Sequence, residues 1–239
     1  MTSLLFFGLF ESGHWAPQLP QPRPPRRTAV FLGIDLTTTE QKPTACALLD
    51  ASGALASVDK LRTDDEMVAL VREASPSIIA IDSPLGLPLG MDCLEENCDC
   101  QSVHEFKGRR GERELIDEGI NLYLTTKRSI IKPMVYRAMS LAERFRALGA
   151  EVIEVYPFAS KVRVFGRPIP PKNTREGREF LRRRLEEIIP GLAADERRLD
   201  HDCLDALIAA YTARLRAEGA TDAMGFEEEV KIVVPSRPA

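Results

Sequence analysis

Two hydrophobic periods alternate along the chain, and their order predicts the fold class. Short runs rich in β-branched residues predict strands, and apolar residues at helical spacing predict helices. The expected strands lie at residues 28–36, 44–49, 54–61, 77–81 and 152–156. The expected helices lie at residues 64–74, 109–118, 130–148, 158–165, 176–189 and 201–217. A short apolar run at 230–234 is compatible with a final strand.

Three strands in succession, followed by alternating strands and helices, indicate an α/β domain with a mixed sheet. We therefore expect a five-stranded mixed sheet flanked by helices, with a helical and cysteine-loop insertion after the fourth strand. Pro84 and Pro88 end regular structure just after that strand, because proline has no amide hydrogen to donate. The loop continues to about Lys107, which is longer than most connections and favours a functional segment.

Proline and apolar content set the expected domain limits. Residues 1–27 contain five prolines between Pro17 and Pro25 and are expected to form a disordered leader. A single domain is expected over residues 28–235, followed by a tail at 236–239. With 239 residues, of which 44% are hydrophobic and 28% charged, the chain can bury one large core without disulfides.

The distribution of apolar residues and cysteines predicts a cytoplasmic protein. No apolar run approaches the roughly 18 to 20 residues that span a bilayer, so no membrane contact is expected. The apolar residues 4–10 lack a preceding basic region and a following cleavage site, so no signal peptide is expected there. The odd number of cysteines, five, argues against a disulfide scaffold.

Four aspartates stand where the ligands of α/β proteins collect. Asp35 ends the first expected strand and Asp82 the fourth, and ligands bind at the carboxyl ends of such strands. Asp202 and Asp205 are three residues apart and share one face of the last expected helix. A local alternative stays open for each position. A strand-end aspartate can hydrogen-bond the amides of its own turn, and Asp200 or Asp202 can cap the helix.

Carboxylates that converge on one point repel each other unless a cation neutralises them. Hard oxygen ligands suit Mg²⁺ or Mn²⁺, so the four aspartates predict a site for one of these ions. Two such ions can activate water and stabilise the leaving oxygen of a phosphodiester. The constellation therefore predicts a metal-dependent nuclease that acts on DNA or RNA by a two-metal mechanism.

Four short motifs, in this order along the chain, resemble a known family. They are Gly33-Ile-Asp35-Leu, Ala80-Ile-Asp82-Ser-Pro84-Leu-Gly-Leu-Pro88, Glu154-Val-Tyr156-Pro157 and Asp202-Cys-Leu-Asp205-Ala-Leu. Together they are similar to the domain of unknown function 429 family, regarded as predicted nucleases, over about residues 28–235. The aspartates also resemble the acidic set of the RNase H-like superfamily, especially its Holliday-junction-resolvase branch.

The resemblance implies an RNase H-like fold in which the first and fourth strands are neighbours. It implies a catalytic and metal-binding role for Asp35, Asp82, Asp202 and Asp205. Asp82 stands where the resolvase branch commonly has glutamate, which shortens this ligand. Glu154, on the fifth expected strand, is expected to orient substrate or to join the metal shell through water. Its alternative is a hydrogen bond to the Tyr-Pro turn that follows it.

Charge is unevenly distributed along the chain. The net charge is −4, but residues 107–184 hold 19 Lys and Arg against 9 Asp and Glu. A basic region of this kind is typical of polyanion binding, although solvated helix faces give the same count. Lys127, Arg128 and Lys132 follow two threonines ahead of a helix, so they are the expected phosphate contacts of a nucleic-acid partner. Arg109, Arg110 and Arg113 are weaker candidates for phosphate contact, since such basic runs are more often expected on the solvated surface.

Four residues that can bind zinc lie within twelve positions. Cys93, Cys98, Cys100 and His104 provide thiolates and an imidazole, which suit tetrahedral Zn²⁺. They could form a structural zinc site. Their spacing matches none of the standard zinc patterns, and reduced thiols in a loop are the alternative.

Two other functions fit parts of the pattern. The turn after Asp35 resembles the phosphate-binding turn of the actin-like ATPases and sugar kinases, which would give Thr37 a phosphate contact. One domain supplies only half of the cleft of those proteins, and the Leu36-Thr37 pair lacks the glycine usual in that turn. The other alternative is a nucleic-acid-binding module that has the fold without catalysis.

Overall fold

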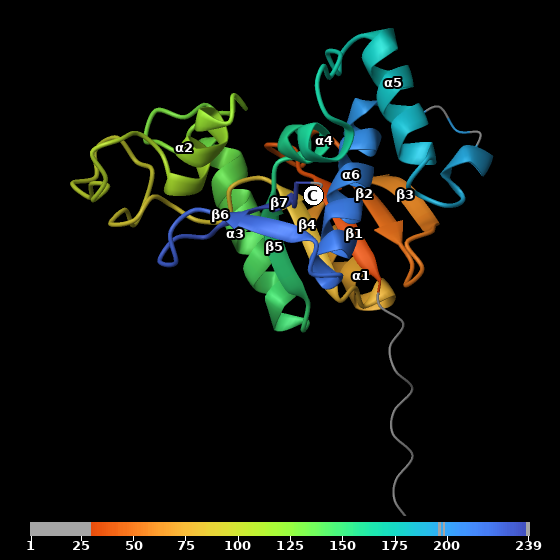
Figure 1. Ribbon diagram of the computed structural model, residues 1–239. Helices are drawn as coiled ribbons and strands as arrows, with labels where there is room; N and C mark the ends of the chain where they lie inside the picture. The colour runs from red at the N-terminus through yellow and green to blue at the C-terminus, as the bar shows by residue number, and fades with distance from the viewer. Residues whose placement is uncertain (1–29, 196, 198, 238–239) are drawn as a thin grey trace, which may run out of the picture.

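A single mixed sheet of seven strands runs through the centre of the molecule (Figure 1). The computed structural model describes residues 30–195, 197 and 199–237, so the expected leader at 1–27 and the end of the expected tail lie outside the described residues. The strands are β1 (Phe31–Asp35), β2 (Thr44–Leu49), β3 (Leu55–Leu61), β4 (Ile78–Asp82), β5 (Glu151–Val155), β6 (Thr221–Met224) and β7 (Ile232–Pro235). Their spatial order is β3-β2-β1-β4-β5-β7-β6.

Strand pairing places the first and fourth strands side by side. β1 runs antiparallel to β2 and parallel to β4, with Gly33 opposite Ala80. β5 runs parallel to β4 on the far side. The carboxyl ends of β1, β4 and β5 therefore lie at the same end of the sheet. This order confirms the neighbouring strands that the RNase H-like resemblance implies.

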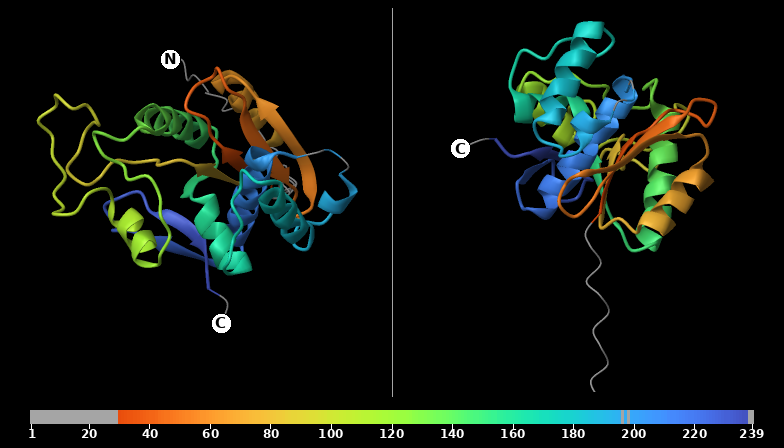
Figure 2. Two further views of the ribbon diagram at one scale, coloured as in Figure 1. Left: turned by 90° about the horizontal axis from the view of Figure 1, so that it is seen from above. Right: turned by 90° about the vertical axis from the view of Figure 1, so that its right-hand side faces the viewer.

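Helices cover both faces of the sheet. They are α1 (Asp64–Ala74), α2 (Arg110–Asp117), α3 (Lys132–Ala147), α4 (Pro157–Phe165), α5 (Arg175–Glu186) and α6 (His201–Ala217), with a short 3-10 helix at Leu192–Ala194. α1 and α3 pack on one face, and α6 packs on the other with α4 and α5 against it (Figure 2). Among the described helices, none is long and apolar enough to cross a membrane.

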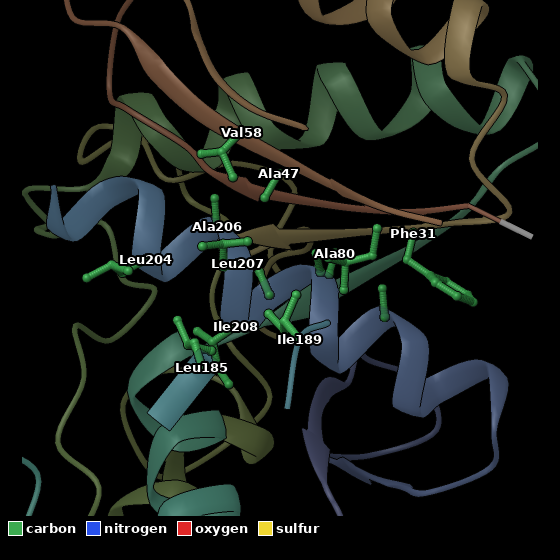
Figure 3. Close-up of a cluster of buried hydrophobic side chains, with 14 of the residues drawn as sticks. Phe31, Ala47, Val58, Ala80, Leu185, Ile189, Leu204, Ala206, Leu207 and Ile208 are labelled. Carbon is green, nitrogen blue, oxygen red and sulfur yellow. The ribbon is translucent and has the colours of Figure 1, made fainter. Parts of the chain in front are cut away.

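Successive side chains along β1 point alternately into the apolar layers on the two faces of the sheet. Ile34 points into the apolar layer formed with α1 and α3, whereas Phe31 belongs to the layer formed with α6 (Figure 3). Gly33 also faces α6: a Cβ atom there would lie 2.0 Å from Ala206 O and 2.2 Å from Ala210 N. The helix can lie this close to the strand because glycine has no side chain.

The predicted α/β class is confirmed, but the sheet has seven strands where five were predicted. β7 corresponds to the apolar run at 230–234, whereas β6 was not predicted. The β6 sequence, Thr-Asp-Ala-Met, contains no fully buried residue because β6 is an edge strand that pairs only with β7. Its residues therefore lack the apolar alternation that identifies a strand from sequence.

The loop between β4 and α2 spans residues 83–109 and contains no helix or strand. It extends away from the sheet, next to the start of α3 (Figure 2). Leu94 is buried, and its amide donates a hydrogen bond to Tyr136 Oη on α3 (2.6 Å). The Leu89 amide donates to Glu229 Oε1 (3.0 Å). Two separate parts of the domain therefore anchor this long loop.

Candidate active site

Three carboxylates gather at the carboxyl end of the sheet. Asp35 and Asp82 are the last residues of the parallel neighbours β1 and β4. Asp205 lies in the second turn of α6, which packs across both strands. The side chains of Asp35 and Asp82 share a hydrogen bond, and the charge of Asp205 acts on both. These three residues are called the acidic cluster below.

Burial and the neighbouring negative charges favour protonation of Asp35 and Asp82. Burial, followed by the charges of Asp82 and Asp205, raises the pKa of Asp35 to about 10. Burial, followed by the charge of Asp205, raises the pKa of Asp82 to about 7, and Lys172 acts in the opposite direction. With no further cation beside it, Asp35 is therefore protonated at neutral pH and donates to Asp82.

Two lysines neutralise Asp205. Lys172 Nζ donates to Asp205 Oδ2 (3.0 Å), and Lys161 Nζ pairs with Oδ1. The contact with Lys161 lacks hydrogen-bond geometry, so Asp205 Oδ1 is a buried acceptor without a hydrogen bond. Lys161 is itself buried on α4, whereas 53% of the Lys172 side chain is exposed. When all five groups are ionised, the carboxylates exceed the ammonium groups by one negative charge.

Asp202 makes its contacts outside the acidic cluster. Its Oδ2 accepts from Lys60 Nζ (3.1 Å), and its Oδ1 lies 3.2 Å from His201 Nδ1. Lys60 also pairs with Asp200, which caps α6 by accepting from the Cys203 amide (3.1 Å). The helix cap is therefore Asp200, one of the two residues that the local alternative named, and the Asp202 side chain is tied to Lys60 at the rim of the site.

Glu154 belongs to a separate buried network. It accepts from Arg109 Nη1 (2.7 Å) and from the Leu85 amide (2.8 Å), and Arg109 also pairs with Glu112. Burial raises the pKa of Glu154, and the Arg109 guanidinium opposes that rise. The expectation that Arg109 lies on the solvated surface is wrong, because only 1% of it is exposed. Glu154 hydrogen-bonds neither the acidic cluster nor the Tyr-Pro turn that follows it.

A cavity of about 300 Å³ lies between the acidic cluster and the Glu154 network. Asp82 and Lys172 line it on the acidic side, and Glu154 lines it on the other. Tyr123 and Tyr156 add aromatic rings to the wall. The cavity therefore offers an apolar and aromatic space directly beside a carboxylate.

Thr37 is engaged within its own turn. Its Oγ1 donates to Lys42 O (2.9 Å) and lies 3.0 Å from Thr44 Oγ1. Arg137 Nη1, from α3, donates to the Thr37 carbonyl (2.7 Å). The hydroxyl that could contact a phosphate is thus already hydrogen-bonded inside the protein.

The three basic residues predicted to contact phosphate lie next to the loop at 83–109. Lys127 Nζ donates to the carbonyl of Cys98 in that loop. Lys132 Nζ and Arg128 Nε each lie 3.7 Å from a glutamate of the loop. Arg128 is the most accessible of the three, with 88% of its side chain exposed.

Three of the four predicted zinc ligands meet in the loop. Cys93, Cys98 and Cys100 place their sulfur atoms within 4.8 Å of one another. A hydrogen bond with Cys98 lowers the pKa of Cys100 to about 7. His104 is not brought to them, because its Nε2 lies 2.8 Å from Glu229 Oε1 and its ring stacks on Phe106.

The lysines of the site were missed as site residues. Lys161 and Lys172 contributed only to the charge of the basic region at 107–184, and Lys60 was given no role. A signal existed for Lys161, because it lies within a largely apolar helical run at 157–165 whose only other charged residue is Arg163, and a lysine is rarely buried unless a partner neutralises its charge. No periodicity or motif distinguishes Lys172, which follows the Pro-rich segment 168–171.

Fold and site together define an α/β protein with carboxylates clustered at the ends of two neighbouring parallel strands. The sequence model of the family described as "Protein of unknown function (DUF429)" matches residues 130–229, which confirms the predicted family resemblance over that segment. Among solved structures, the chain is similar to Thermus thermophilus RuvC, with a TM-score of 0.44 and 14% identity, covering 80% of this chain and 96% of that one. No curated protein matches the sequence.

Proposed function

We propose that this protein is a metal-dependent nuclease that hydrolyses phosphodiester bonds of DNA or RNA. The convergence of Asp35, Asp82 and Asp205 carries the proposal. These side chains come from distant parts of the sequence and are buried together, although the charge of Asp205 disfavours the ionised forms of both Asp35 and Asp82. Strongly raised carboxyl pKa values beside a cavity are typical of functional sites.

The donor atoms of the acidic cluster suit a hard divalent cation, Mg²⁺ or Mn²⁺. Its three members supply carboxylate oxygens, the donors that these ions prefer, and Asp205 Oδ1 is a buried acceptor without a hydrogen bond. When Asp35 gives up its proton to the cation, the cluster carries one excess negative charge, and it carries a second when Lys172 moves away from Asp205. When bound, a divalent ion lowers the pKa of water and stabilises a leaving oxygen.

The residues around the cation site have distinct proposed roles. Asp82 ends β4 at the wall of the cavity, so it would hold the cation beside the space that substrate can enter. Lys172 is half exposed, so its ammonium group can leave Asp205 and pair with a phosphate oxygen of the substrate. That movement would bind the substrate and at the same time free the Asp205 carboxylate for the cation. Asp202 adds negative charge at the rim. Glu154 holds Arg109 at the cavity wall and acts by positioning rather than by contact with the reacting atoms.

Replacing Lys172 by methionine is expected to tighten Mn²⁺ binding by about 10-fold, because a cation no longer has to displace an ammonium group worth about 1.4 kcal/mol. Cleavage should fall at the same time, since the phosphate contact is lost. Titration calorimetry with Mn²⁺ measures the first effect. Lys231→Met is the matched control, because Lys231 pairs with Glu227 away from the acidic cluster. An unchanged Mn²⁺ affinity in Lys172→Met would contradict the proposed exchange.

Arg128→Ala is expected to weaken nucleic-acid binding at low salt and to reduce the slope of log K against log salt by about 1, because one phosphate contact is removed. Arg175→Ala is the matched control, since 84% of that side chain is exposed and it lies on α5. Fluorescence anisotropy at several salt concentrations gives both slopes. Equal slopes of log K against log salt for the two variants would show that Arg128 does not contact the nucleic acid.

Cleavage assays test the function itself. The full chain is incubated with single-stranded, duplex and branched DNA and with RNA, in the presence of Mg²⁺, Mn²⁺ or a chelator. Hydrolysis that requires the divalent ion is expected on at least one substrate. If nothing is cleaved but salt-dependent binding persists without regard to Mg²⁺, the protein is a binding module. Thermal stabilisation by ATP without cleavage would favour the actin-like alternative.

A further inference from the structure

The loop between β4 and α2 holds a group of three thiols, called the thiol cluster, that no part of the proposed nuclease uses. It consists of Cys93, Cys98 and Cys100, all half-buried. Besides the sulfur contacts, Cys100 N donates to Cys98 Sγ (3.5 Å), and Cys100 Sγ donates to the Cys93 carbonyl (3.5 Å). The backbone of the loop thus folds back on itself so that three side chains meet at one point.

The spacing of the sulfur atoms matches tetrahedral coordination. Zinc–sulfur bonds of about 2.3 Å at tetrahedral angles separate neighbouring sulfur atoms by about 3.8 Å. Cys93 Sγ and Cys100 Sγ are 3.9 Å apart, and all three sulfur atoms lie within 4.8 Å of one another. A disulfide would need about 2.05 Å and would use only two of the three thiols. The geometry therefore favours a shared cation over a covalent link.

We propose that the thiol cluster binds a zinc ion through three sulfur ligands. Thiolates are soft donors, which select zinc over the hard Mg²⁺ or Mn²⁺ of the acidic cluster. His104 does not complete the set, because Glu229 and Phe106 hold its ring elsewhere. A solvent molecule or an added ligand fills the fourth position. This inference is independent of the proposed nuclease activity, since the two sites share no residue.

The ion would stabilise the loop and, through it, the position of the basic segment at 127–136. Lys127 donates to the carbonyl of Cys98, a member of the thiol cluster, and Tyr136 Oη accepts from the amide of Leu94, the residue after Cys93. The thiol cluster and its immediate neighbour therefore both contact this segment. A long loop without secondary structure gains order when a metal ion ties distant positions together. Binding of zinc should therefore hold Lys127 and its neighbours in place.

Metal analysis and cobalt spectroscopy test this site. The purified chain, dialysed against metal-free buffer, is expected to retain about one zinc ion per chain. After zinc removal, Co²⁺ should give a near-ultraviolet thiolate-to-cobalt band, which Cys93→Ser lowers by about a third because one of three sulfur ligands is lost. The triple serine variant should lose the band. Cys46→Ala, which removes a buried thiol of β2, and Asp35→Asn should keep it.

Other outcomes would overturn the inference. When the protein is unfolded in the presence of a chelator and without a reducing agent, all five cysteine thiols should react with a thiol reagent. A count of three reactive thiols would show that two of them form a disulfide. A cobalt band that persists in the triple variant would place the metal elsewhere. Limited proteolysis gives a readout of the structural role: cleavage within residues 83–109 should accelerate at least several-fold in the triple variant while its far-ultraviolet spectrum stays unchanged. Equal cleavage rates in the wild type and the triple variant would show that zinc, even if it binds, does not stabilise the loop.

Discussion

Asp35→Asn is expected to abolish metal-dependent cleavage and, unlike most substitutions in a buried site, to stabilise the metal-free protein. Activity should fall by more than about 100-fold, since even residues that only support a metal ligand commonly contribute 10- to 100-fold. Stability should rise because Asp35 is ionised in the unfolded chain and must take up a proton on folding, a cost that neutral asparagine of the same shape does not have.

The gain in stability should depend on pH in a defined direction. Folding raises the pKa of Asp35 from 3.8 to about 10. The neutral carboxyl therefore contributes its full stability below about pH 4, and this contribution is lost as the pH rises toward 10. Relative to wild type, Asp35→Asn should be about equally stable at pH 4 and more stable, by on the order of 4 kcal/mol, at pH 7.

Thermal unfolding between pH 4 and pH 9, with and without Mn²⁺, measures this effect. Mn²⁺ should raise the melting temperature of the wild type and leave that of Asp35→Asn nearly unchanged. Asp59→Asn is the matched control, because this aspartate is exposed on β3. If wild type and Asp35→Asn lose stability in parallel with rising pH, the carboxylates do not interact as the structure indicates.

Gly33→Ala is expected to cost about 3 kcal/mol or more and to disrupt the acidic cluster at the same time. The added methyl group would lie 2.0 Å from Ala206 O and 2.2 Å from Ala210 N, and both are backbone atoms that cannot rotate away. The only relief is a shift of α6 away from β1. Asp205 is carried by that helix, so the shift should separate it from Asp35 and weaken Mn²⁺ binding.

Urea unfolding and Mn²⁺ calorimetry test both parts of this prediction. Gly219→Ala serves as the control, because a side chain there contacts nothing within 4 Å and meets only the strain of a positive φ. That variant should lose about 1 kcal/mol and bind Mn²⁺ normally. A Gly33→Ala protein that is destabilised yet binds Mn²⁺ with wild-type affinity would show that the helix position does not set the site.

The positions of the strand-end acids could be predicted because local pattern determines them. A buried run followed by an aspartate fixes that residue at the end of its strand, and parallel neighbours end together. Helical spacing likewise placed Asp205 beside the apolar face of α6. These three positions needed no knowledge of long-range side-chain contacts, only the order of the strands.

Partners that depend on tertiary packing could not be predicted. Asp202 and Asp205 look equivalent in sequence, but Lys60 from β3 holds the first and lysines from two other segments hold the second. Arg109 looks like a surface residue because the sequence does not show that Glu154 will lie opposite it. In each case the deciding partner is more than 30 positions away, and its identity follows from packing rather than from spacing.

The close approach of α6 to β1 has a consequence for which substitutions the protein can tolerate. At Gly33 the backbone of β1 lies directly against the backbone of α6, and no flexible side chain lies between them that could move to make room for added atoms. The distance between the helix and the strand therefore depends on the lack of a side chain at this position. Larger residues at Gly33 or on the facing turns of α6 would therefore be excluded on steric grounds alone, even in a homologue that has lost every carboxylate.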